Sequence, residues 1–543
     1  MTFSPDTVAR EVSRRRTFAI ISHPDAGKST MTEALALHAR MISEAGAVHG
    51  KAGRKSTVSD WMEMEKARGI SVSSTALQFN YTASQSPTTP ADDPDNPHVV
   101  NLVDTPGHAD FSEDTYRVLT AVDAAVMLID AAKGLEPQTL KLFQVCRHRG
   151  IPVITVVNKW DRPGRTPLEL IDEITDRIGL TPTPLFVPVG IAGDFRGLLD
   201  RRTGEYVRFS RTAGGAKIAP EEILDADAAV AREGDEWTSA LEESELLSEM
   251  GQDHDQEMFL AGETSPMIFT SAMLNFGVRQ LLEALVELAP APAGRADIDD
   301  TVREVTEPFS AVVFKVQAGM DSSHRDRLAY MRIVSGEFER GMVVTHAQTG
   351  KPFATKYAQA VFGRDRSTVD TAYPGDVVGL VNAMALAPGD TLFDAPRVQF
   401  PPIPSFAPEH FSTLRANSAG KYKQFRKAMD QLDSEGVVQV LRNDTRGDAS
   451  PVLAAVGPMQ FEVVTARMKS EFGVDTTIEP LGYSLARRTD EESRASLDRQ
   501  RGVEVFTRTD GAILALFSDK WRLAYVEKEL PDLTLEPLVA TAD

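Results

Sequence analysis

Residues 22–29 are Ser22, His23, Pro24, Asp25, Ala26, Gly27, Lys28 and Ser29, and they directly follow a short apolar run at residues 18–21. This order matches the phosphate-binding loop that joins a strand to a helix, except that Ser22 stands in place of its first glycine. Gly27 lets backbone N–H groups approach phosphates at the start of the helix, Lys28 supplies a cation to the β- and γ-phosphates, and Ser29 is a ligand for Mg²⁺. The stretch therefore predicts a nucleoside triphosphate site on an α/β fold.

A second polar motif follows the apolar run at residues 99–103 and consists of Asp104, Thr105, Pro106, Gly107 and His108. An aspartate at the end of a strand can hold Mg²⁺ through water, and Gly107 leaves room for a backbone N–H to reach a γ-phosphate. His108 stands where a side chain can orient the attacking water, so we expect it to be the catalytic residue. Taken alone, the motif is also compatible with a strand-ending turn that carries a surface histidine.

The third motif, directly after residues 151–157, is Asn158, Lys159, Trp160 and Asp161. The carboxylate of Asp161 can accept hydrogen bonds from both the ring N–H and the exocyclic amine of guanine, whereas adenine has no matching pair of donors. The aliphatic stem of Lys159 can cover the face of the base. Ser271 and Ala272 are a weaker match to the last base-contacting loop, whose backbone would touch the guanine oxygen. Three motifs in this order, each after a predicted strand, predict a domain that binds GTP and GDP.

The wider pattern predicts three domains. Over the first 290 residues, apolar runs alternate with helical patterns, which favours a mostly parallel sheet wrapped by helices. Four prolines mark residues 83–97 as an exposed loop between two strands. Glycine-punctuated, valine-rich runs then favour a small closed β-barrel, and mixed helix and strand patterns follow it. We expect a multidomain α/β protein with a P-loop GTPase domain at residues 1–292, a β-barrel at 305–400 and an α+β domain at 401–543.

Composition narrows the class of protein. The 543 residues are 42% hydrophobic and 25% charged, which is typical of a globular protein rather than of a disordered chain or a membrane protein. The apolar runs are too short to span a bilayer, residues 1–16 show no signal peptide, and the single Cys146 allows no internal disulfide. These features predict a cytoplasmic protein with no membrane partner.

The net charge of −21 at first argues against a nucleic-acid partner, but much of it is local. Residues 221–263 contain fifteen acidic residues and one arginine, a net charge of −14. This acidic insertion is either a solvated helical face or a docking surface for a basic partner. Elsewhere, Lys421, Lys423, Arg426 and Lys427 form a basic cluster that is either a contact for an anionic partner or a solvated helix face.

The motifs resemble those of the translational GTPases, and the surrounding sequence is similar to the bacterial peptide chain release factor 3 family, in the elongation factor G-like subfamily. The similar stretches are residues 59–71, 104–117, 324–327, 372–379, 406–410 and 435–440, so the resemblance extends over nearly the whole chain. It implies a GTP-binding domain, then a translation-factor β-barrel, and then an α/β domain that contacts the ribosome. Residues 60–71 would be a mobile switch, with Ser71 as a third ligand of Mg²⁺ beside Ser29 and Asp104.

The resemblance also implies a function. Members of that family bind a ribosome that has released its peptide while a class I release factor still occupies it. GTP binding then favours a ribosomal conformation that ejects this factor, and hydrolysis lets the family member leave. His108 falls on the family's water-positioning histidine, Asp25 falls in its phosphate-binding loop, and ribosomal RNA is expected to help place His108. The protein is expected to be monomeric off the ribosome.

Two alternatives are weaker. A translocase similar to elongation factor G, or a ribosomal protection protein, would carry further domains for which the roughly 140 residues after residue 404 leave no room. A GTP-sensing scaffold that hydrolyses nothing would not need His108 together with Asp104 and Lys28. The sequence departs from the family in its Pro-rich loop at residues 83–97, which is longer than usual, and in its last 60 residues, which match less clearly.

Overall fold

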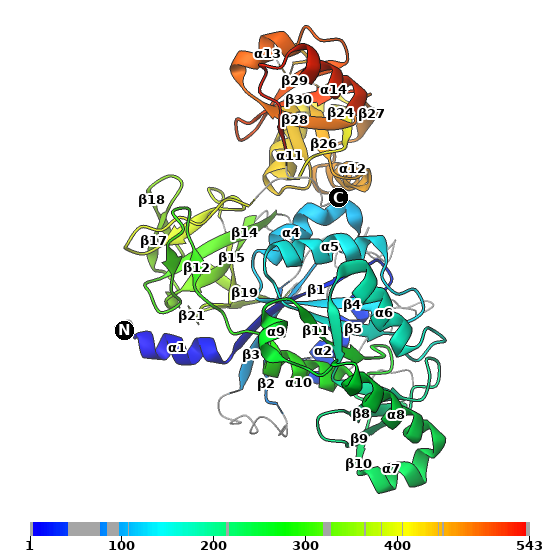
Figure 1. Cartoon of the computed structure of the whole chain (residues 1–543). Coiled ribbons are helices and arrows are strands. Elements are labelled where there is room, and N and C mark those ends of the chain that lie inside the picture. Colours follow the sequence, from blue (N-terminus) through cyan, green and yellow to red (C-terminus); the bar gives the residue numbers. More distant parts are fainter. Residues whose placement is uncertain are drawn as a thin grey trace.

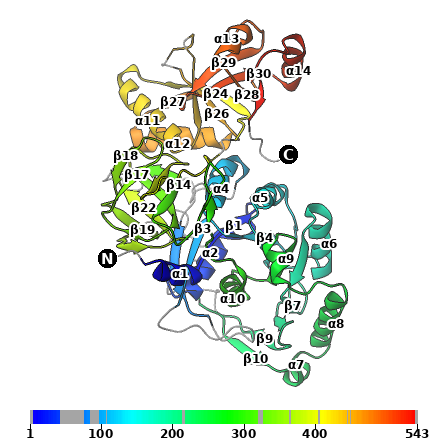
Figure 2. The same cartoon turned by 60° about the vertical axis from the view of Figure 1, so that its left-hand side comes forward.

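The computed structural model describes residues 4–41, 76–83, 97–106, 108–212, 217–318, 327–362, 365–381, 383–403, 406–443, 445–447 and 450–538. The predicted switch with Ser71, Gly107 and most of the Pro-rich loop lie outside these residues. The chain forms three parts in order, which Figures 1 and 2 show as separate groups of elements. The first part runs from α1 (Pro5–Ser13) to α10 (Val278–Leu288), the second from β14 (Ser310–Ala318) to β23 (Thr391–Phe393), and the third from β24 (His410–Ala416) to β31 (Glu536–Pro537).

The first part is built on a seven-stranded sheet with the order β2-β3-β1-β4-β5-β11-β6. Its strands are β1 (Arg15–Ser22), β2 (Ala76–Tyr81), β3 (His98–Asp104), β4 (Ala124–Asp130), β5 (Val153–Asn158), β6 (Thr181–Pro184) and β11 (Thr264–Phe269). All neighbours are parallel except β2, which pairs antiparallel with β3. The strands are almost entirely buried, as expected of a sheet covered on both faces. The predicted mostly parallel sheet is confirmed.

Helices pack on the faces of this sheet. They are α2 (Lys28–His38), α4 (Ser112–Leu119), α5 (Pro137–His148), α6 (Pro167–Ile178) and α10. Helix α2 packs against α10, and α4 packs against α5. Helix α6 begins with a complete capping box, in which Thr166 and Glu169 satisfy each other's backbone N–H groups. Among the described residues, no helix is both long enough and apolar enough to cross a bilayer.

The acidic insertion at residues 221–263 is part of a larger folded unit on the edge of the first part. A four-stranded antiparallel sheet, β7 (Phe186–Val189), β8 (Gly197–Asp200), β9 (Tyr206–Phe209) and β10 (Glu221–Leu224), is followed by α7 (Ala226–Glu233), α8 (Asp235–Glu249) and α9 (Gln256–Leu260). Helix α8 buries Trp237 completely against Tyr206. Several carboxylates pair with arginines of the same part: Glu233 with Arg196 and Arg208, Glu221 with Arg279, and Asp253 with Arg201. The insertion is therefore more than a solvated face, because its own domain neutralises part of its charge.

One carboxyl group of the insertion gives the protein a pH-dependent stability. The Oε1 atom of Glu243 in α8 is buried and has no hydrogen-bond partner among the described residues, and burial raises its pKa to about 7. Folding therefore favours the protonated form. The stabilisation is complete below the unfolded-state pKa of about 4.5 and is lost as the pH rises through about 7.

We expect Glu243→Gln to raise the thermal midpoint of the protein strongly at pH 8 and only slightly at pH 5, because pH 5 lies just above the unfolded-state pKa. The gain in the free energy of unfolding at pH 8 is at most about 3 kcal/mol, and solvent screening of the group reduces it. Thermal unfolding at both pH values measures it, with Glu242→Gln, an exposed neighbour on the same helix, as the control. An equal gain at pH 5 and pH 8 would contradict the assignment.

The second part is an antiparallel β-structure. Its eight-stranded sheet has the order β18-β17-β23-β14-β15-β22-β19-β20, and β16 (Phe338–Glu339) pairs separately with β21 (Thr371–Ala372). The remaining strands are β15 (Arg327–Ser335), β17 (Val343–His346), β18 (Lys351–Ala354), β19 (Ala358–Phe362), β20 (Asp365–Thr368) and β22 (Val377–Val381). The predicted β-domain is present around a buried core that includes Phe309, Phe338 and Leu392. In the described residues its edge strands β18 and β20 are not paired with each other, so hydrogen bonds between these edges do not close the barrel.

A buried polar network joins the first two parts. Asp376, which is 3% exposed, lies 3.0 Å from Nε of Arg15 and accepts hydrogen bonds from Gln78 at 2.9 Å and Asn101 at 3.2 Å. The backbone N–H of Tyr373 donates to its other oxygen at 2.9 Å. Arg15, Gln78 and Asn101 lie on β1, β2 and β3, so one carboxylate holds three strands of the seven-stranded sheet against the second part.

Removing this carboxylate is expected to be costly. Asp376→Ala removes the acceptor of two side-chain amides, Gln78 and Asn101, and leaves Arg15 with Glu11 as its remaining ionic partner, so we expect a loss of about 2–4 kcal/mol in the free energy of unfolding. Urea unfolding measures the loss. Asp370→Ala is the matched control, because Asp370 forms an exposed pair with Arg340 that contributes about 1 kcal/mol or less. Equal losses in the two variants would contradict the role of Asp376.

The third part is an α+β unit, as predicted. Its eight-stranded sheet has the order β27-β24-β26-β25-β29-β30-β28-β31, with β25 (Gln439–Arg442), β26 (Val452–Ala455), β27 (Thr476–Pro480), β28 (Leu485–Thr489), β29 (Val503–Arg508) and β30 (Ile513–Phe517). Helices α11 (Tyr422–Ser434) and α12 (Met459–Phe472) pack together on the first half, while α13 (Glu491–Leu497) and α14 (Lys520–Glu529) pack on the second. Figures 1 and 2 place α12 at the boundary with the first part, close to α4.

Candidate nucleotide site

The predicted motifs meet at one edge of the seven-stranded sheet. Strands β1, β3, β4 and β5 end at Ser22, Asp104, Asp130 and Asn158. Their parallel register aligns these ends, since Ile20 pairs with Asp104 and Asp130 pairs with Asn158. Ligands of open α/β sheets bind at the carboxyl ends of the strands, so the fold itself gathers the motifs into one site.

The phosphate-binding loop has the backbone that its glycine predicts. Gly27 adopts a left-handed conformation with φ of 99° directly before α2, and Asp25 also has a positive φ of 68°. A Cβ at Gly27 would collide with the side-chain amide of Asn158. Glycine is therefore required here both for the turn and for the close approach of the guanine motif. Helix α2 begins at Lys28, so its N-terminus is directed at the loop.

The predicted phosphate and magnesium residues lie side by side. Nζ of Lys28 donates to Oδ1 of Asp104 at 2.7 Å, and the Asp104 side chain is fully buried. Ser29 is the second residue of α2. A hydroxyl and a carboxylate are the hard oxygen donors that Mg²⁺ prefers, and in phosphate sites the remaining ligands are phosphate oxygens and water.

The guanine motif is tied directly to the phosphate loop. The Asn158 amide donates to the Ala26 carbonyl at 2.9 Å, and the Lys159 ammonium donates to the Asp25 carbonyl and to Asp130 at 2.8 Å. Burial acts to raise the pKa of Asp130, but the hydrogen bond and charge of Lys159, together with hydrogen bonds from the backbone N–H groups of Ala132 and Lys133, outweigh it and hold that pKa below its ordinary value. Asp130 was not predicted from the sequence. The available signal was a carboxylate that directly follows the buried run of β4.

The base-recognition carboxylate is oriented by the last motif. Oγ of Ser271 donates to Oδ1 of Asp161 at 2.6 Å, and Trp160, the buried residue just before Asp161, packs edge-to-face on Phe269 at 4.7 Å. The sequence predicted only a backbone role for Ser271 and Ala272. In this structure the Ala272 N–H donates to Asn158 at 3.0 Å, so its contact with the guanine oxygen stays a prediction.

His108 lies at the rim of the site with its side chain 31% exposed. Its Nδ1 atom is 3.3 Å from Oδ1 of Asp110 and 3.3 Å from the Asp110 backbone N–H nitrogen. The hydroxyl of Thr105 donates to the Ile20 carbonyl at 2.6 Å, which fastens the turn before His108 to β1. His23 instead lies 3.3 Å from Glu136, so its side chain is engaged at the far side of the phosphate loop.

Comparison with known proteins covers all three parts. The Elongation factor Tu GTP binding domain matches residues 13–291, Elongation factor G domain 2 matches residues 308–395, and the Class II release factor RF3, C-terminal domain matches residues 400–527. A crystal structure of a protein from Thermus thermophilus shares the fold with a TM-score of 0.68, at 22% identity, over 87% of this chain and 68% of that chain.

Sequence relatives agree over almost the full length. Peptide chain release factor 3 of Microcystis aeruginosa is 45% identical over 98% of this chain and 96% of its own. The corresponding protein of Gloeothece citriformis is 46% identical over 96% and 95%, and that of Gloeobacter violaceus is 45% identical over 98% of both chains. The GTP-binding segment and this near-complete similarity confirm the resemblance, and the chain belongs to the peptide chain release factor 3 family of translational GTPases.

Proposed function

We propose that this protein uses GTP on the ribosome to remove class I release factors after peptide release, and so recycles them. The observation that carries the proposal is the presence, in one chain, of guanine-nucleotide motifs at the strand ends of the first part and a third part that matches the release factor C-terminal domain. The protein would act in the cytoplasm and be monomeric off the ribosome. The division into domains at residues 1–292, 305–400 and 401–543 belongs to this proposal and is supported by the three matched segments.

Nucleotide binding would use the groups at the strand ends. Asp161, oriented by Ser271, accepts the two N–H groups of guanine, and the stem of Lys159 covers the base. The Lys28 ammonium group, which donates to Asp104 in this structure, would also donate hydrogen bonds to the β- and γ-phosphates. Ser29 and Asp104, with Ser71, would hold Mg²⁺, which neutralises charge on the phosphate oxygens during the reaction. The proposed contacts to the nucleotide come from Ser22, His23, Pro24, Asp25, Ala26, Gly27, Lys28, Ser29, Asp104, Thr105, Pro106, Gly107, His108, Asn158, Lys159, Asp161, Ser271 and Ala272.

Hydrolysis adds water to the γ-phosphorus, breaks its bond to the β–γ bridging oxygen and yields GDP and phosphate. His108 would orient that water, and its exposed position leaves it open to an outside partner. Ribosomal RNA placing His108 would make hydrolysis depend on the ribosome. Because a nucleotide biases only those states for which its bound form has different affinity, GTP and GDP would favour ribosome-bound and free protein respectively.

The third part offers a surface suited to ribosomal RNA. Lys423, Arg426 and Lys427 are exposed on α11, and no hydrogen bond or ion pair to the described residues engages their side chains. The ammonium group of Lys421, by contrast, donates to the Gly473 carbonyl. Of the four basic residues singled out in the sequence, three are thus available to phosphates.

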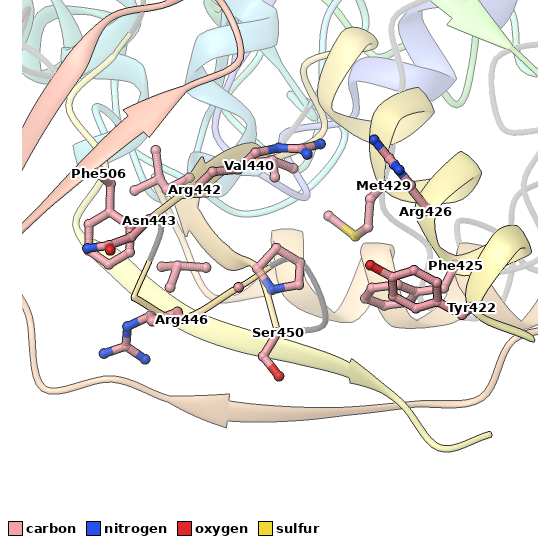
Figure 3. A pocket seen from close by; sticks show the side chains of 14 residues that line it. Tyr422, Phe425, Arg426, Met429, Val440, Arg442, Asn443, Arg446, Ser450 and Phe506 are labelled. Atoms are coloured by element: carbon pink, nitrogen blue, oxygen red, sulfur yellow. The ribbon is translucent and has the colours of Figure 1, made fainter. Parts of the chain in front are cut away.

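A pocket lies beside this helix (Figure 3). The exposed Tyr422 lies at one end next to the buried Phe425, and Arg446 lies at the other end, where it pairs with Glu504. An exposed aromatic ring beside free cationic side chains is a usual receptor for unstacked bases and phosphates of single-stranded RNA. Tyr422 and the exposed α11 cations therefore support RNA as a ligand of this face.

We expect Lys423→Glu combined with Lys427→Glu to lower ribosome affinity by about 10-fold or more at low salt. The slope of the logarithm of the binding constant against the logarithm of the salt concentration should become shallower by about two. Ribosome co-sedimentation over a salt series measures both. Lys520→Glu combined with Lys528→Glu is the matched control. These exposed lysines lie on α14, so the double variant changes the net charge by the same amount but leaves α11 unchanged. Equal losses in the two double variants would show a general effect of net charge instead.

The first test of the proposed function is GTP hydrolysis by the purified protein with and without ribosomes, together with the turnover of a class I release factor over several rounds of termination. Strong stimulation with faster turnover is the expected result. Stimulation without faster turnover would contradict recycling and leave a translational GTPase with another task. No stimulation would contradict the role on the ribosome and favour a GTP-sensing scaffold.

A further inference from the structure

One side chain joins the turn of His108 to the third part of the chain. Asp110, in the short 3₁₀ helix at Ala109–Phe111, is only 9% exposed. Its Oδ2 atom accepts a hydrogen bond of 2.6 Å from the backbone N–H of Met459, while its Oδ1 atom is 3.3 Å from Nδ1 of His108. The same carboxylate thus contacts the proposed catalytic residue and an element 349 positions away in the sequence.

The contact on the third part is the N-terminus of α12. The N-cap residue of this helix is Pro458, which has no side-chain hydrogen bond to offer. Helix N-termini need acceptors for their first N–H groups, and a carboxylate there is further favoured by the helix dipole. Asp110 therefore caps α12 from another domain. A Cβ at Gly457 would collide with the Asp110 carboxyl group, so the turn before α12 is shaped to admit it.

Other contacts surround this hydrogen bond. Phe111 packs with Val463 in a separate buried cluster, Tyr116 meets Phe406 edge-to-face at 5.2 Å, and Arg117 donates to the Glu435 carbonyl at 3.4 Å. A pocket lined by residues of all three parts adjoins the cluster. The segment that carries His108 lies at this joint, so a change in the relative placement of the two parts would reach it.

We infer that Asp110 is a positioning residue that couples His108 to the placement of α12, so that the third part governs the rate of hydrolysis. With the Met459 bond formed, Asp110 is fixed beside Nδ1 of His108, which accepts from the Asp110 backbone N–H when it is unprotonated and donates to Oδ1 when it carries a proton. When the ribosome shifts α12, the bond changes and the His108 ring moves with it. This inference rests on the proposed function, since it assigns to the third part a role in the same reaction.

The test perturbs the contact from the far side. Gly457→Ala places a methyl group against the Asp110 carboxyl group, and neither Gly457 nor its control Gly482 has a positive φ. Gly482→Ala meets open space and leaves the contact intact. We expect Gly457→Ala to lower the ribosome-stimulated kcat by about 10-fold, with the half-saturating ribosome concentration and GTP affinity unchanged, whereas Gly482→Ala behaves as the parent.

Two further measurements separate positioning from a loss of folding. Asp110→Ala is expected to lose as much activity as Gly457→Ala, while Asp110→Asn keeps most of it, because the amide oxygen still accepts the Met459 N–H. The imidazole NMR signal of His108, assigned from its loss in His108→Ala, is expected to shift in Gly457→Ala and not in Gly482→Ala. Parent-like kcat and an unshifted signal in Gly457→Ala would overturn the inference. A parent protein that ribosomes do not stimulate would instead refute the proposed function.

Discussion

His108→Ala is expected to keep GTP binding and to lose ribosome-stimulated hydrolysis by about 10²-fold or more, the usual effect of removing a group that orients the attacking water. The backbone beneath it should hold, because the Thr105 hydroxyl fastens the preceding turn to β1 at 2.6 Å without help from the His108 ring. Phosphate release at saturating ribosomes measures the rate, and nucleotide titration checks binding.

The matched control for this prediction is His148→Ala. His148 is exposed near the end of α5 and belongs to none of the motifs at the nucleotide-binding edge of the sheet. The control variant should hydrolyse GTP at the parent rate. Near-parent turnover by His108→Ala, or a comparable loss in His148→Ala, would refute the role assigned to His108.

The second large effect concerns the base. Asp161→Asn is expected to shift the preference between GTP and xanthosine triphosphate by about 10²-fold or more in favour of xanthosine triphosphate. The carboxylate can only accept hydrogen bonds, whereas an amide can donate one to the second carbonyl oxygen of xanthine. The Ser271 hydroxyl, which donates to Asp161 Oδ1 at 2.6 Å, can donate equally to an amide oxygen, so the orientation of the side chain is kept.

A competition experiment with labelled GTP measures this preference. Asp172→Asn, an exposed aspartate on α6, is the matched control and should leave selectivity unchanged. Ser271→Ala should weaken both nucleotides by about 10-fold without altering the preference, because it removes only the hydrogen bond that orients Asp161. Unchanged selectivity in Asp161→Asn would refute guanine recognition by this carboxylate.

These effects are expected to be largely independent. His108 and Asp161 share no contact partner, and sites without shared partners usually add in their free energies. Asp110 is different, because it contacts His108 directly. Combining Asp110→Ala with His108→Ala should therefore cost little more activity than His108→Ala alone.

Local sequence predicted where the motifs lie in the fold. The phosphate loop, the Asp104 turn and the Asn158 motif all follow the ends of predicted strands, whereas their contacts with a nucleotide stay predictions. Such features are readable because their causes are local. Glycine backbone freedom, strand burial and the spacing of apolar residues each operate within about a dozen residues.

Contacts between segments distant in the sequence were not predicted. Asn158 and Ala26 within the first part, and Arg15 with Asp376 and Asp110 with Met459 between parts, all join segments more than 100 positions apart. In the sequence each of these residues has an ordinary local role: a motif amide, a surface charge, a turn aspartate. Their partners are set by the packing of the folded chain, and local patterns such as apolar periodicity or turn residues do not predict this packing.

The sequence by itself thus determined the chemistry of the site, because the loops that bind phosphate and guanine need particular residues at fixed spacing. Only the tertiary structure decided which distant residues position these side chains and which of them connect the site to the other parts. It brought Ser271 to Asp161, placed Asp376 between three strands, and set Asp110 between His108 and α12. The physical reason is that a buried carboxylate must find donors wherever the folded chain supplies them, and the chain supplies them from distant segments.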